Sequence, residues 1–198
     1  MTSRREFVQA GLAVAALPVA AQAAFAMAPA SVPLVSLYRV LYDTRFPACI
    51  AFARRAAARG LAVHAMAGDM TRFWYDDLYY RWRQEPVAIA GLTAEGALFC
   101  LERLAWDQRM RVVYRGEHSP LADGSVAHRF EGPEALLPAA ADAAAADAGW
   151  AHAMADIVAK CPRGRAPSST LQAVTLQAAT ATPSEALFSW VIAPVARS

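Results

Sequence analysis

The chain has few of the residues that mark several common classes of protein. Only 10 glycines and 12 prolines occur among its 198 residues, which is too few for a fibrous or low-complexity chain. Three cysteines exclude a small fold held together by many disulfides. The formal net charge is only +2, so the composition gives no indication of a nucleic-acid partner.

The chain does have a high proportion of apolar residues. Hydrophobic residues make up 57% of it and charged residues 18%, a balance that excludes an intrinsically disordered protein. Domains usually contain roughly 100 to 200 residues, so this length corresponds to one domain. We therefore expect a single domain with a sizeable hydrophobic core.

The first residues follow the order of an export signal: charge, an apolar stretch and a cleavage site. Residues 3–8 read Ser-Arg-Arg-Glu-Phe-Val, and an alanine-rich apolar stretch follows over 11–21. Small-residue cleavage sites come next, at 21–23 and at 24–26. The apolar stretch is shorter than the roughly 20 residues of a permanent membrane span. The alternative is an ordinary N-terminal helix with a chance arginine pair.

This segment resembles a twin-arginine export signal, whose pattern is Ser-Arg-Arg-x-Phe-Leu. Val8 stands where the pattern has leucine, and Gln9 replaces the lysine that usually follows. The resemblance implies recognition by the twin-arginine translocation machinery, folding before export, and a periplasmic location. It also implies that the protein carries a cofactor, travels with a partner that does, or folds too fast for the unfolded route.

Strand-like and helix-like patterns alternate after this signal. We expect a signal peptide over 1–23, a flexible leader over 24–33 and one α/β domain over 34–198. Runs of β-branched and aromatic residues predict strands at 34–42, 61–66, 86–92, 111–115, 125–130, 171–177 and 187–195. Helical spacing of apolar residues predicts helices at 47–59, 71–84, 94–110 and 139–160.

Such alternation favours parallel strands joined by crossover helices. The predicted fold is a three-layer α/β domain, in which helices cover both faces of a mainly parallel sheet. A late antiparallel hairpin is expected as well, because Asp123-Gly124 is a turn signal between the strands at 111–115 and 125–130.

Polar residues gather at the carboxyl ends of the predicted strands, where α/β sheets bind ligands. The predicted ligand-binding residues are Asp43, Thr44, Arg45, Thr71, Trp74 and Thr93. An arginine there would clamp a carboxylate or phosphate, and the following helix N-termini favour an anion. The alternative is that these aspartates and threonines only cap helices, as Thr93 would for 94–110.

Three residues near the same ends are candidates for acid–base catalysis: Asp69, Glu117 and His118. No nucleotide-binding, phosphate-loop or nucleophile-elbow motif accompanies them, so the sequence leaves open whether the protein is an enzyme. The four histidines lie far apart in sequence, and no metal site is predicted. His64, inside an apolar run, is expected to be a core residue.

The three cysteines lack the spacing of redox or haem-attachment motifs. Cys49 lies near the start of a predicted helix, where the helix dipole would lower the thiol pKa. The stronger alternative places Cys49 and Cys100 among core-facing residues, where a thiol behaves as a small apolar group. A disulfide between two of the three, with Cys161 as one candidate, is also open.

Residues 73–82 contain six aromatic side chains, more than one narrow helical stripe can bury. Either this helix is deeply inserted in the core, or some rings are exposed to a ligand or partner. In the second case the helix would form a wall of the strand-end site.

Three functions are compatible with these observations. The first is a periplasmic small-ligand-binding or accessory protein with a polar cleft at the strand carboxyl ends. The second is a small subunit co-exported with a larger cofactor-bearing oxidoreductase. The third is an acid–base enzyme that uses Asp69, Glu117 and His118. The sequence identifies no cofactor.

Overall fold

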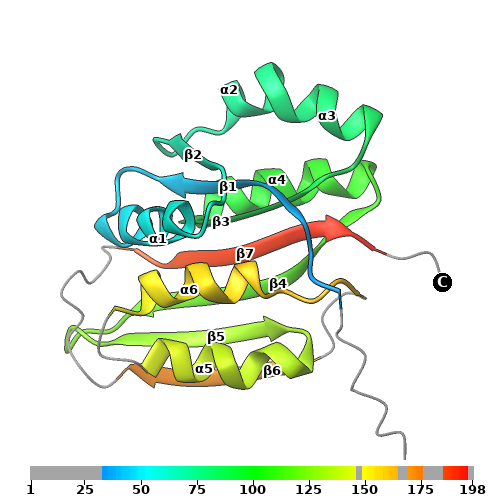
Figure 1. Cartoon of the computed structure of the whole chain (residues 1–198). Coiled ribbons are helices and arrows are strands. Elements are labelled where there is room, and N and C mark those ends of the chain that lie inside the picture. Colours follow the sequence, from blue (N-terminus) through cyan, green and yellow to red (C-terminus); the bar gives the residue numbers. More distant parts are fainter. Residues whose placement is uncertain (1–32, 146–148, 165–168, 176–184, 196–198) are drawn as a thin grey trace, which may run out of the picture. The chain divides into compact units, whose positions relative to one another are not determined.

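Seven strands form one mixed sheet in the order β2-β1-β3-β7-β4-β5-β6 (Figure 1). The computed structural model describes residues 33–145, 149–164, 169–175 and 185–195. The predicted export signal and most of the predicted leader lie outside these residues, and the described residues all belong to one compact unit. The strands are β1 (Leu37–Asp43), β2 (Val63–Met66), β3 (Ala88–Ala94), β4 (Met110–Pro120), β5 (Val126–Gly132), β6 (Ser169–Thr175) and β7 (Leu187–Pro194).

Helices lie on both faces of this sheet. They are α1 (Pro47–Ala58), α2 (Thr71–Phe73), the π-helical turn η1 (Trp74–Leu78), α3 (Tyr79–Gln84), α4 (Glu95–Asp107), the 3-10 turn η2 (Glu134–Leu136), α5 (Leu137–Ala145) and α6 (Trp150–Ala159). Pro47 occupies the first turn of α1, where backbone N–H groups have no hydrogen-bond partner within the helix, so the missing N–H of proline costs nothing. No helix in the described part of the chain is long and apolar enough to cross a membrane.

The α/β class is confirmed, but the sheet is not mainly parallel. Only β1 with β2 and β1 with β3 pair in parallel, and the other four neighbouring pairs are antiparallel. The expected hairpin is present as β4 and β5, with its turn at Asp123 and Gly124. The local alternation was therefore read correctly, while the direction of pairing was not.

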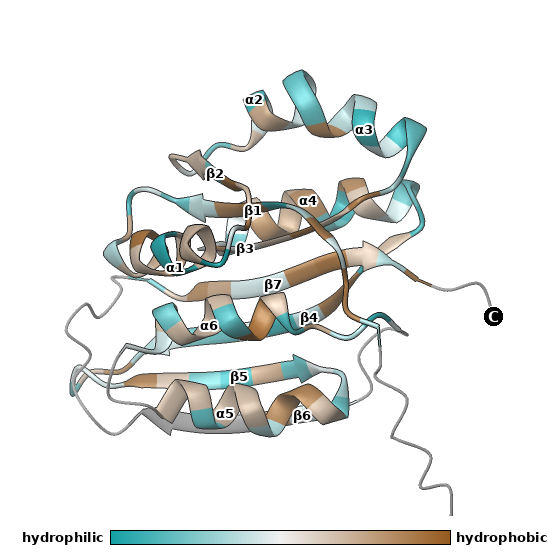
Figure 2. Ribbon diagram, in the orientation of Figure 1, coloured by the Kyte–Doolittle hydropathy of each residue, from teal (hydrophilic) through white to brown (hydrophobic). Residues whose placement is uncertain are grey.

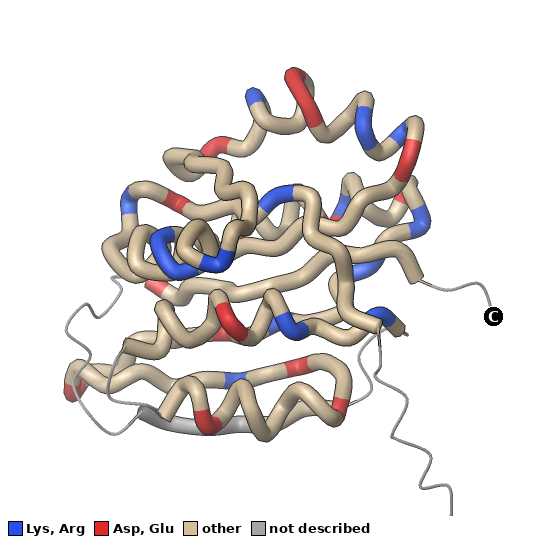
Figure 3. The backbone as a smooth tube through the Cα atoms, viewed as in Figure 1, with Lys and Arg blue, Asp and Glu red and all other residues tan. Residues whose placement is uncertain are grey.

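The last strand of the chain, β7, lies in the middle of the sheet between β3 and β4. It is almost wholly buried. Figure 2 shows it as mostly apolar, and Figure 3 shows no charged residue along it. Gly91 on β3 pairs with Trp190, and a Cβ at Gly91 would lie 2.6 Å from the Trp190 ring. Only glycine fits there, because the indole occupies the space of a side chain.

Each face of the sheet has its own core. Helices α1, α5 and α6 cover one face (front in Figure 1), where Phe52 and Met154 are fully buried. Helix α4 and the α2–η1–α3 segment pack on the other face, around Leu101, Trp82 and Trp190. Burial of these large side chains is the main force that holds the layers together.

Two helix predictions differ from the structure. The single helix expected over 139–160 is two helices, because Gly149 interrupts it with a φ of 97° that other residues rarely adopt. Trp150 and Met154 of α6 are buried, and so is Cys161, which follows the helix. Thr93 does not cap α4: Ala94 precedes the helix, and Thr93 belongs to β3.

Candidate functional site

Asp43 and Arg45, predicted as ligand-binding residues, bind each other. Asp43 is fully buried, and the Arg45 guanidinium donates to its carboxylate through Nε at 3.0 Å and Nη2 at 2.7 Å. The backbone N–H of Arg45 donates to the same carboxylate at 3.1 Å. Gly68 packs against this guanidinium, where a Cβ would lie 2.7 Å from Cζ. The arginine expected to hold a ligand anion therefore holds Asp43.

The two threonines at the strand ends are also engaged within the protein. The Thr44 hydroxyl donates to the Met66 carbonyl at 3.1 Å, which ties β1 to β2. Thr93 is fully buried and accepts a hydrogen bond from the Trp190 indole N–H at 3.1 Å. These contacts satisfy buried polar groups, so both side chains have a structural role.

The three predicted acid–base residues do not meet. Asp69 follows β2 and is exposed, and hydrogen bonds from Thr71 hold its pKa below the ordinary value. Four strand spacings separate β2 from β4, about 19 Å. Glu117 and His118 are consecutive in β4 and therefore point to opposite faces of the sheet. The geometry supports no shared acid–base role for these residues.

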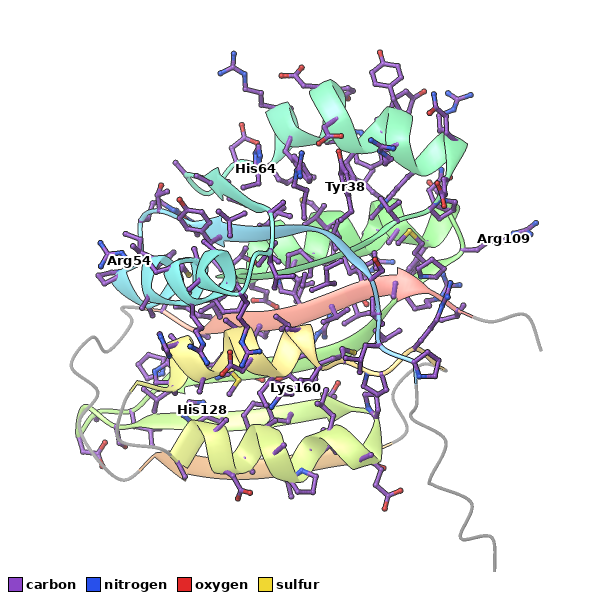
Figure 4. The ribbon with its side chains drawn as sticks, in the orientation of Figure 1. Tyr38, Arg54, His64, Arg109, His128 and Lys160 are labelled. Atoms are coloured by element: carbon purple, nitrogen blue, oxygen red, sulfur yellow. The ribbon has the colours of Figure 1, made fainter. Side chains whose placement is uncertain are left out.

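His118 instead belongs to a buried polar cluster that the sequence did not reveal. Its Nδ1 lies 2.7 Å from Nδ1 of His128, and its Nε2 lies 2.9 Å from the Ser189 hydroxyl. The Ser189 oxygen lies 3.4 Å from the Tyr114 hydroxyl. The cluster joins β5, labelled at His128 in Figure 4, to β4 and β7.

The sequence held one signal for this cluster, which went unused because the strand predicted at 111–115 ends before His118. The Asp123-Gly124 turn fixes the register of β4 and β5, and that register places His118 opposite His128. No local pattern placed Ser189, because it lies 71 residues from His118.

The cluster has the hydrogen-bond order of a nucleophile, a base and an orienting group. Burial makes that chemistry inaccessible, since Ser189 and His118 are both fully buried and the Trp150 ring stacks on His118 at 4.2 Å. The same burial lowers the pKa of both histidines, that of His128 to about 4. At neutral pH the cluster therefore consists of uncharged imidazoles that link strands.

The cysteines reverse one expectation. Cys49 is buried, and desolvation raises its thiol pKa to about 12 despite its place near a helix start. The stronger alternative, a thiol in the core, therefore holds for Cys49, and burial also raises the thiol pKa of Cys161. Cys100 is exposed rather than part of the core, and all three thiols are free.

The remaining predicted residues, Thr71 and Trp74, lie in a groove of about 390 Å³ between α2–η1 and α4. The groove is lined by Met70, Thr71, Trp74, Tyr75, Phe99, Cys100, Arg103 and Leu104, and we call this set the aromatic groove. Trp74 is held in place by edge-on contacts with Trp82 at 5.9 Å and with Tyr79.

Both expectations for the aromatic-rich helix hold for different rings. Phe73 and Trp82 are buried against the sheet, and the Trp82 indole donates to the Val87 carbonyl at 2.8 Å. Tyr75 and Tyr80 face outward with 62% and 61% of their surfaces exposed. Tyr75 lines the groove, whereas Tyr80 does not.

Across the groove, α4 presents Phe99 and Arg103, which the sequence analysis did not single out. Phe99 is 54% exposed, although its side chain is wholly apolar. The Arg103 guanidinium lies 5.2 Å from the Phe99 ring centroid and 4.3 Å from that of Trp106. The available sequence signal was a phenylalanine one helical turn before an arginine.

A cavity of about 430 Å³ lies beside the amino ends of β1 and β3. It contains one aromatic side chain, Tyr38, whose hydroxyl already donates to Asp77 at 2.7 Å. The aromatic groove combines three rings with a cation, so it is the better candidate for a binding site.

Among the described residues, no group of three or more potential ligands is placed to hold a metal ion. No protein-family model matches the chain, and no curated protein or solved structure shows significant similarity to it. The aromatic groove is therefore the feature of the described residues that bears most directly on function.

Proposed function

We propose that this protein is a binding protein that holds a small ligand with a flat aromatic ring in the aromatic groove. The observation that carries the proposal is the position of Trp74, Tyr75 and Phe99 around one hollow of about 390 Å³. Ligand pockets of proteins fall in this range of volume and are lined mainly by apolar and aromatic side chains.

Packing supports a preformed site. Trp74 is fixed against Trp82 on the sheet side, and Phe99 belongs to the regular helix α4. A ring that enters between them meets walls that are already ordered, so little conformational entropy is lost on binding. The ligand would also cover apolar surface that is otherwise exposed to water.

A second candidate function is an accessory subunit of a larger protein. It is favoured by Trp106, which is 44% exposed on the same side of α4 but lies outside the groove. Together with Phe99 and Arg103 it gives the composition of protein-binding hot spots. A co-exported oxidoreductase subunit is one such partner.

We further propose that the protein acts in the periplasm after export by the twin-arginine route. The support is the pattern at residues 3–8 with the apolar stretch behind it. Changing Arg4 and Arg5 together to lysine should leave the protein in the cytoplasm, as measured by immunoblotting of cell fractions. Normal appearance of the double variant in the periplasm would contradict this route.

Titration of the purified full-length chain with 2-naphthoate and 2-naphthalenemethanol tests the binding function. We expect at least one probe to bind, followed through the NMR signals of its aromatic protons. Tyr75→Ala and Phe99→Ala should each weaken binding about tenfold, because each removes a ring contact.

Tyr80→Ala is the matched control, since Tyr80 is as exposed as Tyr75 and lies on the same helical segment outside the groove. Its affinity should equal that of the unchanged protein. Equal losses in Tyr75→Ala and Tyr80→Ala, or no binding of either probe, would contradict the proposed function.

A further inference from the structure

One charged side chain, Arg103, lines the aromatic groove, and no acidic residue lines it. Thr71 and Cys100 supply a hydroxyl and a thiol, and the other lining side chains are apolar or aromatic. None of the ion pairs formed among the described residues includes Arg103. The groove therefore has a net positive charge that nothing in its lining neutralises.

Two neighbouring acidic residues are paired with other arginines. Glu102, next to Arg103 in α4, accepts a hydrogen bond from Arg115 at 2.7 Å across the helix–sheet contact. Asp76 pairs with Arg72 on the outer surface of the opposite wall at 3.6 Å. Neither carboxylate pairs with Arg103, and none of the ion pairs of the described residues joins it to Asp107, one turn later in α4. The exposed guanidinium is therefore open to an anion from outside.

Two rings restrict where the guanidinium of Arg103 lies. Phe99 and Trp106 both contact it through their faces, and such cation–π contacts favour one position of an otherwise flexible side chain. Contacts with ring faces leave the N–H donors at the edge of the guanidinium free for an acceptor. The fork of two N–H groups matches the two oxygens of a carboxylate.

We propose that the ligand of the aromatic groove is an aromatic carboxylate, whose ring lies among Trp74, Tyr75 and Phe99 while its carboxylate binds Arg103. This inference rests on the proposed function and narrows it to one chemical class. Charge complementarity selects the anion, and the three rings select a flat apolar body. Neither selection depends on the strand-end residues.

The experiment compares 2-naphthoate with 2-naphthalenemethanol, which has the same ring without the charge, and with cyclohexanecarboxylate, which has the charge without the ring. We expect 2-naphthoate to bind the full-length protein about tenfold more tightly than either, as a charge-assisted hydrogen bond implies. Arg103→Gln should remove the preference for 2-naphthoate over the alcohol.

Arg111→Gln is the matched control, because Arg111 is an exposed arginine that also faces Trp106, at 5.9 Å, outside the groove. Arg111→Gln also removes one positive charge close to the groove, but it should keep the preference for 2-naphthoate over the alcohol. Equal losses in both variants would show a general field effect and overturn direct contact.

Other binding results distinguish a failure of the carboxylate inference from a failure of the proposed binding function. Equal binding of both naphthyl probes, weakened by Phe99→Ala, would overturn the carboxylate while the binding function stands. Absence of binding by both naphthyl probes would overturn the function itself. If only an acidic peptide containing phenylalanine binds, the occupant is a protein partner and the small-molecule proposal fails.

Discussion

On one face of the sheet, α1, α5 and α6 cover a core in which even the polar side chains of His118 and Ser189 are fully buried. On the other face, α4 and η1 leave Tyr75 and Phe99 more than half exposed. The first arrangement stabilises the fold, since buried polar groups must be paired. The second leaves apolar surface unfilled, which is typical of binding sites.

We call the face covered by α1, α5 and α6 the closed face and the face with the aromatic groove the open face. The largest expected effect on stability comes from a substitution in the core of the closed face. His118→Ala removes a buried ring and leaves the Ser189 hydroxyl without its imidazole partner, so the free energy of unfolding should fall by about 3 to 5 kcal/mol. Tyr80→Ala on the open face should change it by less than about 0.5 kcal/mol. Urea unfolding followed by far-UV circular dichroism measures both, and similar losses would remove the distinction between the faces.

Acid should weaken the closed face before it affects the ion pairs. Burial holds the pKa values of His118 and His128 below 6.5, so the unfolded chain binds protons first. Their contribution to stability is complete above pH 6.5 and declines toward pH 4, at up to about 1.4 kcal/mol per pH unit for each histidine. Chemical unfolding at several pH values measures this slope.

The aspartates lose their contribution to stability at lower pH than the histidines, so the two contributions can be measured separately. Hydrogen bonds hold the pKa values of Asp69, Asp123 and Asp156 below 3.8, so their contribution is lost only as the pH falls below that value. A variant with His118→Gln and His128→Gln should flatten the slope between pH 6.5 and 4. An unchanged slope in that variant would assign the acid sensitivity to other groups, such as half-buried His64.

The smallest effect concerns thiol chemistry and leaves the fold intact. Cys100 in the open groove should react with an aromatic disulfide reagent within minutes, whereas buried Cys49 and Cys161 should react only after unfolding. One thiol per chain is therefore expected under native conditions. Saturating 2-naphthoate should slow the reaction of Cys100, because both occupy the same groove. Rapid reaction of two or three thiols would mean that the closed face opens readily.

Local patterns predicted most of the strands and helices. The region Pro47–Ala58 was recognised as a helix because proline begins it and Gly60 follows its end. The hairpin of β4 and β5 was recognised from its Asp-Gly turn. These signals act between residues close in sequence, so they do not depend on the rest of the fold.

Pairing between distant strands was not predictable in the same way. β7 pairs with β3 and β4 because its apolar side chains are buried on both faces of the sheet, but many strands have that composition. Its insertion made the sheet mostly antiparallel. It also brought Ser189 to His118 and Trp190 to Thr93, and so placed predicted site residues inside the structure.

The candidate site was found only in part. Trp74 and Thr71 were singled out, but they were assigned to a cleft with Asp43 and Arg45, which instead satisfy each other. Phe99 was missed, because a phenylalanine in a helix is usually buried. Its exposure depends on how α4 packs beside η1.

The sequence by itself determined the α/β class, most element boundaries, the β4–β5 hairpin and the aromatic richness of residues 73–82, because each depends on local chain geometry and spacing. Only the tertiary structure decided which polar groups are buried together and which rings stay exposed. The order of strands sets both outcomes. That order follows from the burial of apolar surface across the whole domain rather than from any single segment.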